Sequence, residues 1–204
     1  FELSDYENRY PLLLNAPYFE IYRKQVVKQA DLVLALHWFG DRFTAEDKAR
    51  AFEYYDRLTV RDSSLSSCTQ AIIAAEVGHL GLAADYLAEA AMMDMRDLEH
   101  NTRDGLHIAS LAGTWLAVVA GFGGMRDHGG QLSFRPQLPP GWDRLCFGLI
   151  WHGARVRVDV RRDQVTYTAT QCPDQGIEVI HADETLLLEP DRAVSRPVEY
   201  VEPI

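Results

Sequence analysis

Two short segments of the sequence carry side chains that could bind a polar or anionic small molecule. Lys28 and Gln29 are adjacent, and a cation beside an amide can hydrogen-bond hydroxyl groups that a ligand buries on binding. Asp62, Ser63 and Ser64 precede a predicted helix, and hydroxyls with backbone N–H groups at a helix N-terminus bind anions. By themselves, the two patterns are more typical of a solvated helix face and of a serine N-cap.

Helices must position both segments, because helical patterns fill the first two thirds of the chain. Apolar residues recur at close to the helical period from residue 17 to residue 38, which predicts one helix that contains the Lys-Gln pair. Thr44 followed by Asp47 predicts the start of a second helix, which runs to about Asp56.

Three more helices are expected before the chain changes character. The third is capped by Ser66 or Ser67 and stops near Gly78, and the fifth ends at a cluster of glycines. Their ranges are Thr69–Val77, Leu82–Met95 and Leu106–Val119.

Beyond Gly130 the pattern predicts strands instead of helices. Prolines break any helix there, and short runs of alternating apolar and polar residues follow. These runs predict a small antiparallel β-sandwich, whereas the proline-rich and charged tail, Glu189–Ile204, is predicted to be irregular. The predicted strands are Leu145–Trp151, Arg155–Val160, Gln164–Ala169, Ile177–His181 and Thr185–Leu188.

Composition narrows the class of protein. The chain has 204 residues, of which 47% are hydrophobic and 25% charged, as in ordinary globular proteins. A formal net charge of -10 argues against nucleic acid or an anionic membrane as the main partner, because both need a basic face. The three cysteines fit neither a disulfide framework nor a zinc site, the histidines lack metal-ligand spacing, and we expect no metal. Reduced thiols and the absence of a long apolar run suit a cytoplasmic protein.

Four segments, in this order and at this spacing, carry a resemblance to a known family. They are Val27-Lys28-Gln29-Ala30-Asp31, Arg61-Asp62-Ser63-Ser64-Leu65-Ser66, Asn101-Thr102-Arg103-Asp104-Gly105-Leu106-His107 and Ser110-Leu111-Ala112-Gly113-Thr114-Trp115. Together they resemble the C-terminal half of glycoside hydrolase family 65, which includes maltose, trehalose, kojibiose and nigerose phosphorylases. The segment from Leu132 to Pro136 also resembles the start of the family's C-terminal β domain.

The resemblance implies a fold and a domain division. Residues 1–125 would be the C-terminal part of an (α/α)6 catalytic barrel, and residues 126–204 a linker and C-terminal β-sandwich domain. The family's general acid is a glutamate in a Gly-Pro-Asp-Glu-Tyr motif upstream of the matching region, and this sequence holds no such motif. The sequence begins with Phe1, so we expect a longer parent protein, with this chain inactive by itself and the N-terminal remainder on another polypeptide or removed.

The implied activity is that of an inverting glycoside phosphorylase, which cleaves an α-linked glucose disaccharide with inorganic phosphate to β-glucose 1-phosphate and glucose. Phosphate is already an anion, so such a site needs hydrogen-bond donors and positive charge instead of a base. The resemblance assigns sugar contacts to Lys28 and Gln29, needs no organic cofactor, and makes a homodimer plausible. Phosphate contacts are assigned to Arg61, Ser63, Ser64, His107 and Thr114. Arg61 departs from the histidine that phosphorylases often carry there, although a guanidinium also binds phosphate.

Two alternatives stay open at this point. An inverting α-glucoside hydrolase on the same scaffold would need a carboxylate base about 6.5–9.5 Å from the acid, and Asp62 or Asp104 could supply it. Each of these residues also fits a structural role, such as capping a helix or pairing with a neighbouring arginine. The second alternative is a non-catalytic module that binds carbohydrate or assembles subunits.

Overall fold

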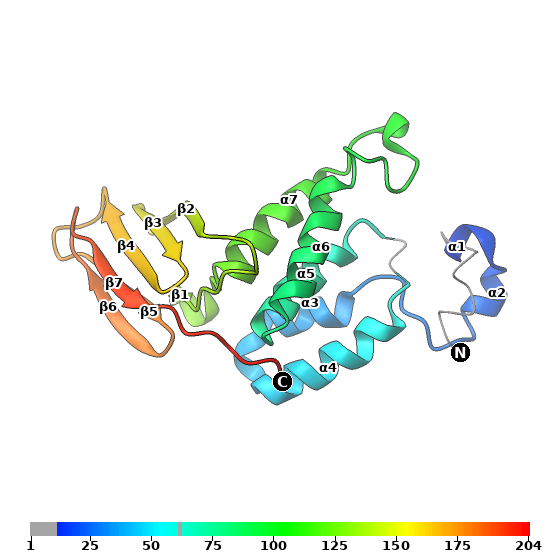
Figure 1. Ribbon diagram of the computed structural model, residues 1–204, viewed down its shortest axis with the longest axis horizontal. Coiled ribbons are helices and arrows are strands. Elements are labelled where there is room, and N and C mark those ends of the chain that lie inside the picture. Colours follow the sequence, from blue (N-terminus) through cyan, green and yellow to red (C-terminus); the bar gives the residue numbers. More distant parts are fainter. Residues whose placement is uncertain (1–11, 61–62) are drawn as a thin grey trace.

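The computed structural model describes residues 12–60 and 63–204, and within these ranges the helices come first and the strands follow (Figure 1). This order confirms the predicted α-then-β class, while membership of the helices in an (α/α)6 barrel stays a prediction. The α-helices are α1 (Leu12–Asn15), α2 (Tyr18–Ile21), α3 (Asp31–Trp38), α4 (Ala45–Leu58), α5 (Ser66–Glu76), α6 (Leu80–Met92) and α7 (Ile108–Leu116). Single turns of 3-10 helix are η2 (Gly40–Arg42), η3 (Thr102–Asp104) and η5 (His128–Gly130), and η4 (Ala117–Phe122) is a π-helix that follows α7 directly.

The single helix predicted over residues 17–38 is wrong, because the chain is irregular between α2 and α3. In that interval Val27 forms a bridge with Thr59, donating from its backbone N–H to the Leu58 carbonyl at 2.9 Å and accepting from the Val60 N–H at 2.8 Å. The apolar residues upstream of the interval face a small separate cluster with Val60, whereas those of α3 face the main core. The apolar residues of two separate segments together gave the spacing expected of one helix. The Lys-Gln pair therefore precedes α3 instead of lying within a helix.

The start of α4 agrees with the sequence, but the start of α5 does not. Thr44 accepts a hydrogen bond from the Asp47 N–H at 3.1 Å, as an N-cap should. Ser66 and Ser67 lie inside α5 instead of capping it, and both are fully buried. Ser67 donates to Glu89 of α6, so its hydroxyl joins two helices.

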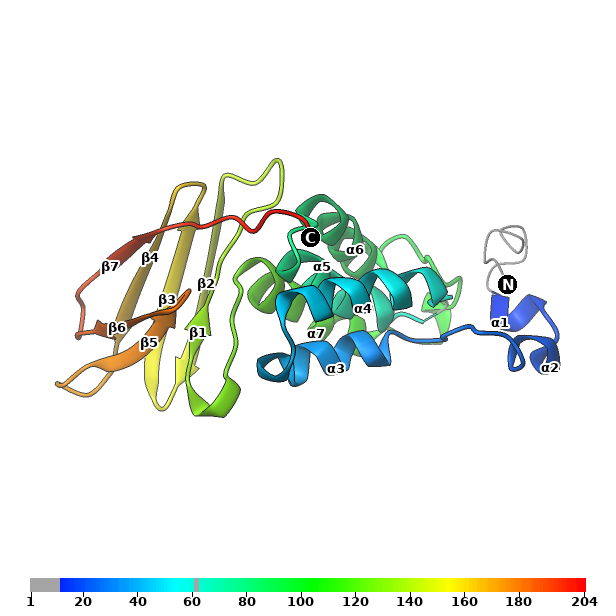
Figure 2. The same ribbon diagram turned by 90° about the horizontal axis from the view of Figure 1, so that it is seen from below.

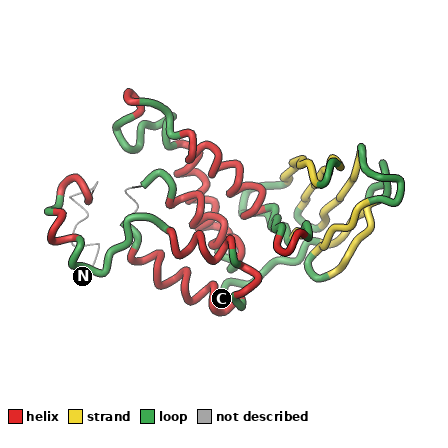
Figure 3. The backbone as a smooth tube through the Cα atoms, turned by 180° about the vertical axis from the view of Figure 1, so that it is seen from behind, coloured by secondary structure: helices red, strands yellow, loops and turns green. Residues whose placement is uncertain are grey.

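Two glycines bring α7 and η4 into close contact with α5. A Cβ at Gly113 would lie 2.5 Å from Cys68 Sγ, and one at Gly121 would lie 3.4 Å from the Ile72 Cα. Because Gly113 meets the start of α5 and Gly121 its later half, the two helical segments run side by side in the same direction. Their N-terminal ends consequently lie at the same end of the helical layer, away from the strands (Figures 1 and 3).

Adding a methyl group at Gly113 is expected to destabilise the protein. Gly113→Ala forces α7 away from Cys68 and should cost about 1–3 kcal/mol of unfolding free energy by overpacking. Gly81→Ala on α6 is the matched control, because nothing lies within 4 Å of its Cβ position, and it should be neutral or slightly stabilising. Urea denaturation of both variants measures the difference, and equal stabilities would contradict this packing.

The strands form two sheets stacked as a sandwich (Figure 2). One is four-stranded and antiparallel in the order β2-β3-β4-β7, and the other is three-stranded in the order β1-β5-β6. The strands are β1 (Ser133–Phe134), β2 (Arg144–Trp151), β3 (Ala154–Arg161), β4 (Gln164–Thr170), β5 (Ile177–His181), β6 (Glu184–Leu188) and β7 (Val194–Pro197). Inward residues of the two sheets meet at Phe134 and Tyr167, whose ring centroids are 5.4 Å apart.

Two features of the sandwich differ from the sequence prediction. The pair β1 and β5 is parallel, so one sheet is mixed rather than purely antiparallel. The tail that was predicted to be irregular contributes β7, which pairs with β4 from Gln164 opposite Pro197 to Tyr167 opposite Val194. Without this pairing, one side of β4 would expose its backbone hydrogen-bonding groups.

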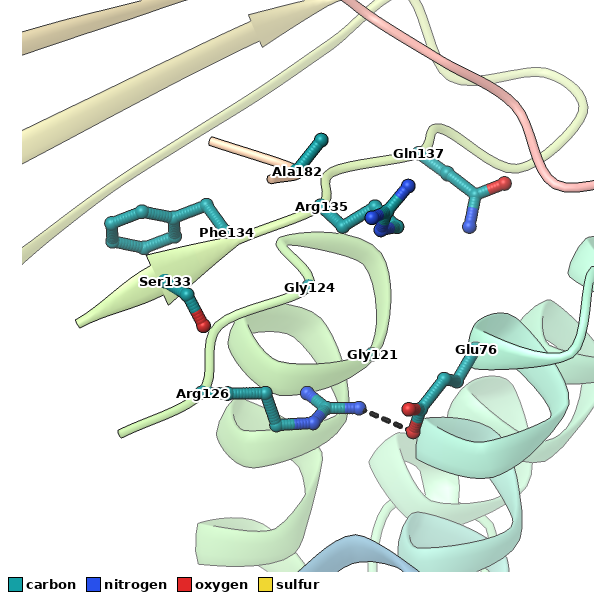
Figure 4. A pocket seen from close by; sticks show the side chains of 9 residues that line it. All are labelled: Glu76, Gly121, Gly124, Arg126, Ser133, Phe134, Arg135, Gln137 and Ala182. Carbon is teal, nitrogen blue, oxygen red and sulfur yellow. Dashed lines mark hydrogen bonds and ion pairs between the residues drawn. The ribbon is translucent and has the colours of Figure 1, made fainter. Parts of the chain in front are cut away.

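A buried cluster of charges fastens the segment between η4 and β1 to the helices (Figure 4). Glu76, at the end of α5, pairs with Lys48 Nζ at 2.5 Å. It also pairs with Arg126 Nη2 at 2.7 Å, the contact drawn in Figure 4. Burial alone would raise the pKa of Glu76, but the charges of Arg126 and Lys48 outweigh burial and hold that pKa below its usual value. Arg126 also donates to the carbonyls of Ala120 and Met125, so the cluster fixes the course of the connecting segment.

A cavity of about 130 Å³ lies beside this cluster, between the helices and the sandwich (Figure 4). Two polar side chains that line it already have protein partners. Gln137 Nε2 donates to the Ala75 carbonyl at 3.4 Å, while its Oε1 accepts from the Val201 N–H at 2.6 Å. Arg135 pairs with Asp183 at 3.0 Å. These contacts make the cavity part of the joint between helices and sandwich.

His37, near the end of α3, is expected to make the stability depend on pH. Burial is the largest influence on its pKa, and with Arg126 it lowers the pKa of His37 from 6.5 to about 4. Between these two pH values the unfolded state binds more protons, so the free energy of unfolding falls as the pH falls, by about 2 kcal/mol over the window. Urea midpoints at pH 4.5 and pH 7 measure this loss. His37→Gln should reduce it, and an unchanged pH dependence in that variant would refute the assignment.

Candidate functional site

Apart from Thr114, which lies in the later half of α7, the predicted binding residues that the structure describes lie around the N-terminal ends of α3, α5 and α7. Gln29 directly precedes the N-cap residue of α3, Ser63 and Ser64 precede α5, and His107 stands at the N-cap of α7. Since α5 and α7 run in the same direction, the serines and the histidine share one end of the helical layer, opposite the sandwich (Figure 1). Backbone N–H groups at such ends carry partial positive charge and favour anions.

Gln29 and Ser63 are in direct contact. The Gln29 side-chain Nε2 donates to Ser63 Oγ at 3.0 Å, and the Leu65 N–H also approaches that oxygen at 3.4 Å. Ser63 is only 9% exposed. Its oxygen already accepts, and no acceptor for its hydroxyl hydrogen is found among residues 12–60 and 63–204, so that hydrogen is the group left to donate to an anion. A residue predicted to bind sugar is thus hydrogen-bonded to a residue predicted to bind phosphate.

The Lys28 side chain lies next to a surface cavity. Lys28 itself is exposed, and the cavity beside it measures about 440 Å³. Two tyrosines, Tyr18 and Tyr22, line it, together with Lys24 and Lys28 and three aliphatic side chains. Flat rings and cations on a concave surface suit a ligand that has both apolar faces and hydroxyl groups.

His107 is held by a carboxylate that the sequence prediction missed. Its Nδ1 lies 2.6 Å from Asp94 Oδ1, and its backbone N–H donates to Asp94 Oδ2 at 3.0 Å. No motif or regular spacing pointed to Asp94, because it precedes His107 by a whole loop. The carboxylate orders both the ring and the first backbone donor of α7.

The loop between α6 and α7, which joins Asp94 to His107, is built with local constraints of its own. Asp97 and His100 have positive φ angles of 48° and 54°, a region that side chains other than glycine seldom occupy. Asp97 Oδ1 accepts from the backbone N–H and the hydroxyl of Thr102, at 2.9 Å and 2.6 Å. These bonds lower the pKa of Asp97 and hold together the two sides of the loop between α6 and α7.

The other predicted site residues have different outcomes. Thr114 donates its hydroxyl hydrogen to the Ser110 carbonyl at 2.9 Å, so that hydrogen already has a partner within α7. Its role in phosphate binding stays a prediction. Asp104, the alternative base, is exposed and lies 3.8 Å from Arg103, and none of its described contacts is with Ser63, Ser64 or His107. Arg61 and Asp62 lie outside the described residues. Ser64 is partly buried beside Ser63.

Two kinds of feature are absent from the described part of the chain. Among residues 12–60 and 63–204 no group of three or more His, Cys, Asp or Glu side chains is arranged to hold a metal ion. In the same ranges, no helix combines the length and the apolar character that crossing a bilayer requires.

Comparison with known proteins decides the family. The model of the glycosyl hydrolase family 65 central catalytic domain matches residues 2–116, and that of the family's C-terminal domain matches residues 125–188. The chain belongs to glycosyl hydrolase family 65. This assignment confirms the resemblance found in the four sequence segments.

The chain is similar to several named proteins of family 65. An uncharacterized glycosyl hydrolase of Mycobacterium leprae is 57% identical over 89% of this chain, which spans 23% of that protein. The α,α-trehalose phosphorylase of Thermoanaerobacter brockii is 38% identical over 90% of this chain and 23% of its own length. A solved structure from the human microbiome, provisionally named a kojibiose phosphorylase, superposes with a TM-score of 0.84 at 25% identity over 93% of this chain and 26% of its own. The chain therefore spans about a quarter of the length of these relatives.

Proposed function

We propose that the protein to which this chain belongs is an inverting glycoside phosphorylase. It cleaves an α-linked glucose disaccharide with inorganic phosphate and releases β-glucose 1-phosphate and glucose. A phosphate oxygen attacks the anomeric carbon, the glycosidic carbon–oxygen bond on the opposite face breaks, and the departing oxygen takes a proton from a general acid. That acid belongs to the N-terminal remainder of the protein, and phosphate is a co-substrate, with no organic cofactor.

One observation carries the proposal: donors suited to an anion share the end of the helical layer where a predicted sugar contact also lies. Ser63 has a hydroxyl hydrogen left to donate, and Gln29 contacts it directly. His107 lies at the start of α7, which runs parallel to α5. Positive charge and donors are what a nucleophilic phosphate needs, whereas activation of water needs a carboxylate base. Relatives named trehalose, maltose and kojibiose phosphorylases support the same reaction class.

The rival function is hydrolysis of the same bond by water. It is favoured by the relatives of 57% and 53% identity, which are named uncharacterized glycosyl hydrolases. In that case Asp62 or Asp104 would act as the base. The cytoplasmic location, the homodimer and the absence of a nucleic-acid partner belong to the phosphorylase proposal as expectations.

Cleavage of maltose, trehalose, kojibiose and nigerose by the full-length protein tests the proposal. Each disaccharide is incubated with and without phosphate, and glucose 1-phosphate and free glucose are measured separately. Glucose 1-phosphate that forms only with phosphate supports the phosphorylase. Free glucose released at equal rates in both conditions overturns it in favour of the hydrolase, and no cleavage of any kind favours a non-catalytic module.

A further inference from the structure

Asp94 holds His107 through two separate hydrogen bonds. One carboxylate oxygen lies 2.6 Å from the ring Nδ1, and the other accepts from the His107 backbone N–H at 3.0 Å. The Asp94 side chain is 8% exposed and the His107 side chain 19%. The carboxylate is therefore the more deeply placed of the two, and the ring is the part that reaches the surface.

This geometry decides which ring nitrogen is left for a ligand. An ionised carboxylate only accepts hydrogen bonds, so the proton of the short contact sits on Nδ1 of His107. Nε2 has no hydrogen-bond partner among the described residues, and it is the atom that remains for an incoming group. From that position Nε2 can hydrogen-bond to a phosphate group, while Asp94 holds the ring from behind.

We propose that Asp94 is a positioning residue for the phosphate co-substrate: it fixes the orientation of the His107 ring so that Nε2 faces the anion. This inference rests on the proposed function. The second bond to the backbone N–H supports it, because the same carboxylate that orients the ring also anchors the start of α7. Carboxylates behind functional histidines commonly set ring orientation in this way.

Asp97 offers the comparison that separates positioning from loop closure. It lies in the same loop and also accepts two hydrogen bonds, but both come from Thr102. A purely structural role for Asp94 would make its substitution resemble that of Asp97. A positioning role would make it resemble substitution of His107.

The experiment is a double-mutant cycle in the full-length protein. Asp94→Ala, His107→Ala, the double variant and the control Asp97→Ala are compared for the KM of phosphate, the KM of the disaccharide, kcat and the thermal midpoint. We expect Asp94→Ala to raise the phosphate KM about tenfold or more, with a smaller change in the disaccharide KM. The double variant should lie within about twofold of His107→Ala, because Asp94 acts through the ring.

Asp94→Asn is a conservative variant, intermediate between the wild type and Asp94→Ala. Its amide keeps one acceptor for the backbone N–H, but the amino group then faces Nδ1 and moves the ring proton to Nε2. Nε2 still donates as a neutral group, so the phosphate KM should fall between those of the wild type and Asp94→Ala. The inference would be overturned if the double variant raised the phosphate KM by the product of the two single effects. It would also be overturned if Asp97→Ala raised the phosphate KM as much as Asp94→Ala does.

Failure of the proposed function is visible separately, in the wild type. If the wild-type protein cleaves the disaccharide equally with and without phosphate, phosphate positioning is overturned together with phosphorolysis. If phosphorolysis is established but the Asp94 and His107 effects multiply, only the positioning role is overturned.

Discussion

Replacing Glu76 with glutamine is expected to lower the free energy of unfolding by about 3 kcal/mol, because two buried cations would lose their shared counter-charge. The side chains of Lys48 and Arg126 are only 10% and 12% exposed, and both pair with Glu76. Glutamine keeps the shape and one acceptor, so the loss reports charge more than packing. The connecting segment that Arg126 anchors should loosen at the same time.

Urea or thermal unfolding of the full-length protein measures this loss. Glu184→Gln is the matched control, since Glu184 forms a bidentate pair with Arg196 at 2.6 Å and 2.7 Å on the exposed surface of the sandwich. Solvent screens that pair, and little change in stability is expected. Equal losses in the two variants would show that the Glu76 cluster contributes no more than a surface ion pair. Because the pKa of Glu76 is lowered, its contribution is present above the ordinary pKa of a glutamate and is lost at lower pH.

Local signals predicted much of this fold. The N-cap at Thr44 and the alternation in β3 depend on neighbouring residues alone, and the structure has both. The strand β5 has the predicted bounds. Such features are predictable because capping and strand pleating are decided within a few residues.

Features that depend on distant partners were missed. The break before α3 exists because Val27 pairs with Thr59, and β7 exists because β4 has a free side. Neither pairing partner can be predicted from the sequence pattern of the neighbouring residues. In the same way, Ser67 looked like a cap but serves as a link to Glu89 across two helices.

The candidate site divides along the same line. Gln29, Ser63 and His107 were predicted from their motifs. Asp94 was not predicted, because only the three-dimensional structure shows its contact with His107. A carboxylate that acts by fixing another side chain has no sequence signature of its own. Its identification needs the three-dimensional geometry.

The contact between Gln29 and Ser63 leads to the last prediction. Gln29→Ala removes the donor that points at Ser63 Oγ and so frees the serine to rotate. We expect it to raise the disaccharide KM about tenfold through the lost amide, and also to raise the phosphate KM through the misplaced hydroxyl. Ser63→Ala should raise the phosphate KM about tenfold to a hundredfold, because it removes a nearly buried donor to an anion.

Gln25→Ala is the matched control for this prediction. Gln25 lies four residues earlier, donates instead to the Tyr54 hydroxyl, and should leave both KM values unchanged. The decisive quantity is the coupling in the Gln29→Ala and Ser63→Ala double variant. If Gln29 orients Ser63, the phosphate KM of the double variant will match that of Ser63→Ala alone, because the oriented group is already gone. Independent effects on phosphate would mean that the 3.0 Å contact fixes the fold without joining the two parts of the site.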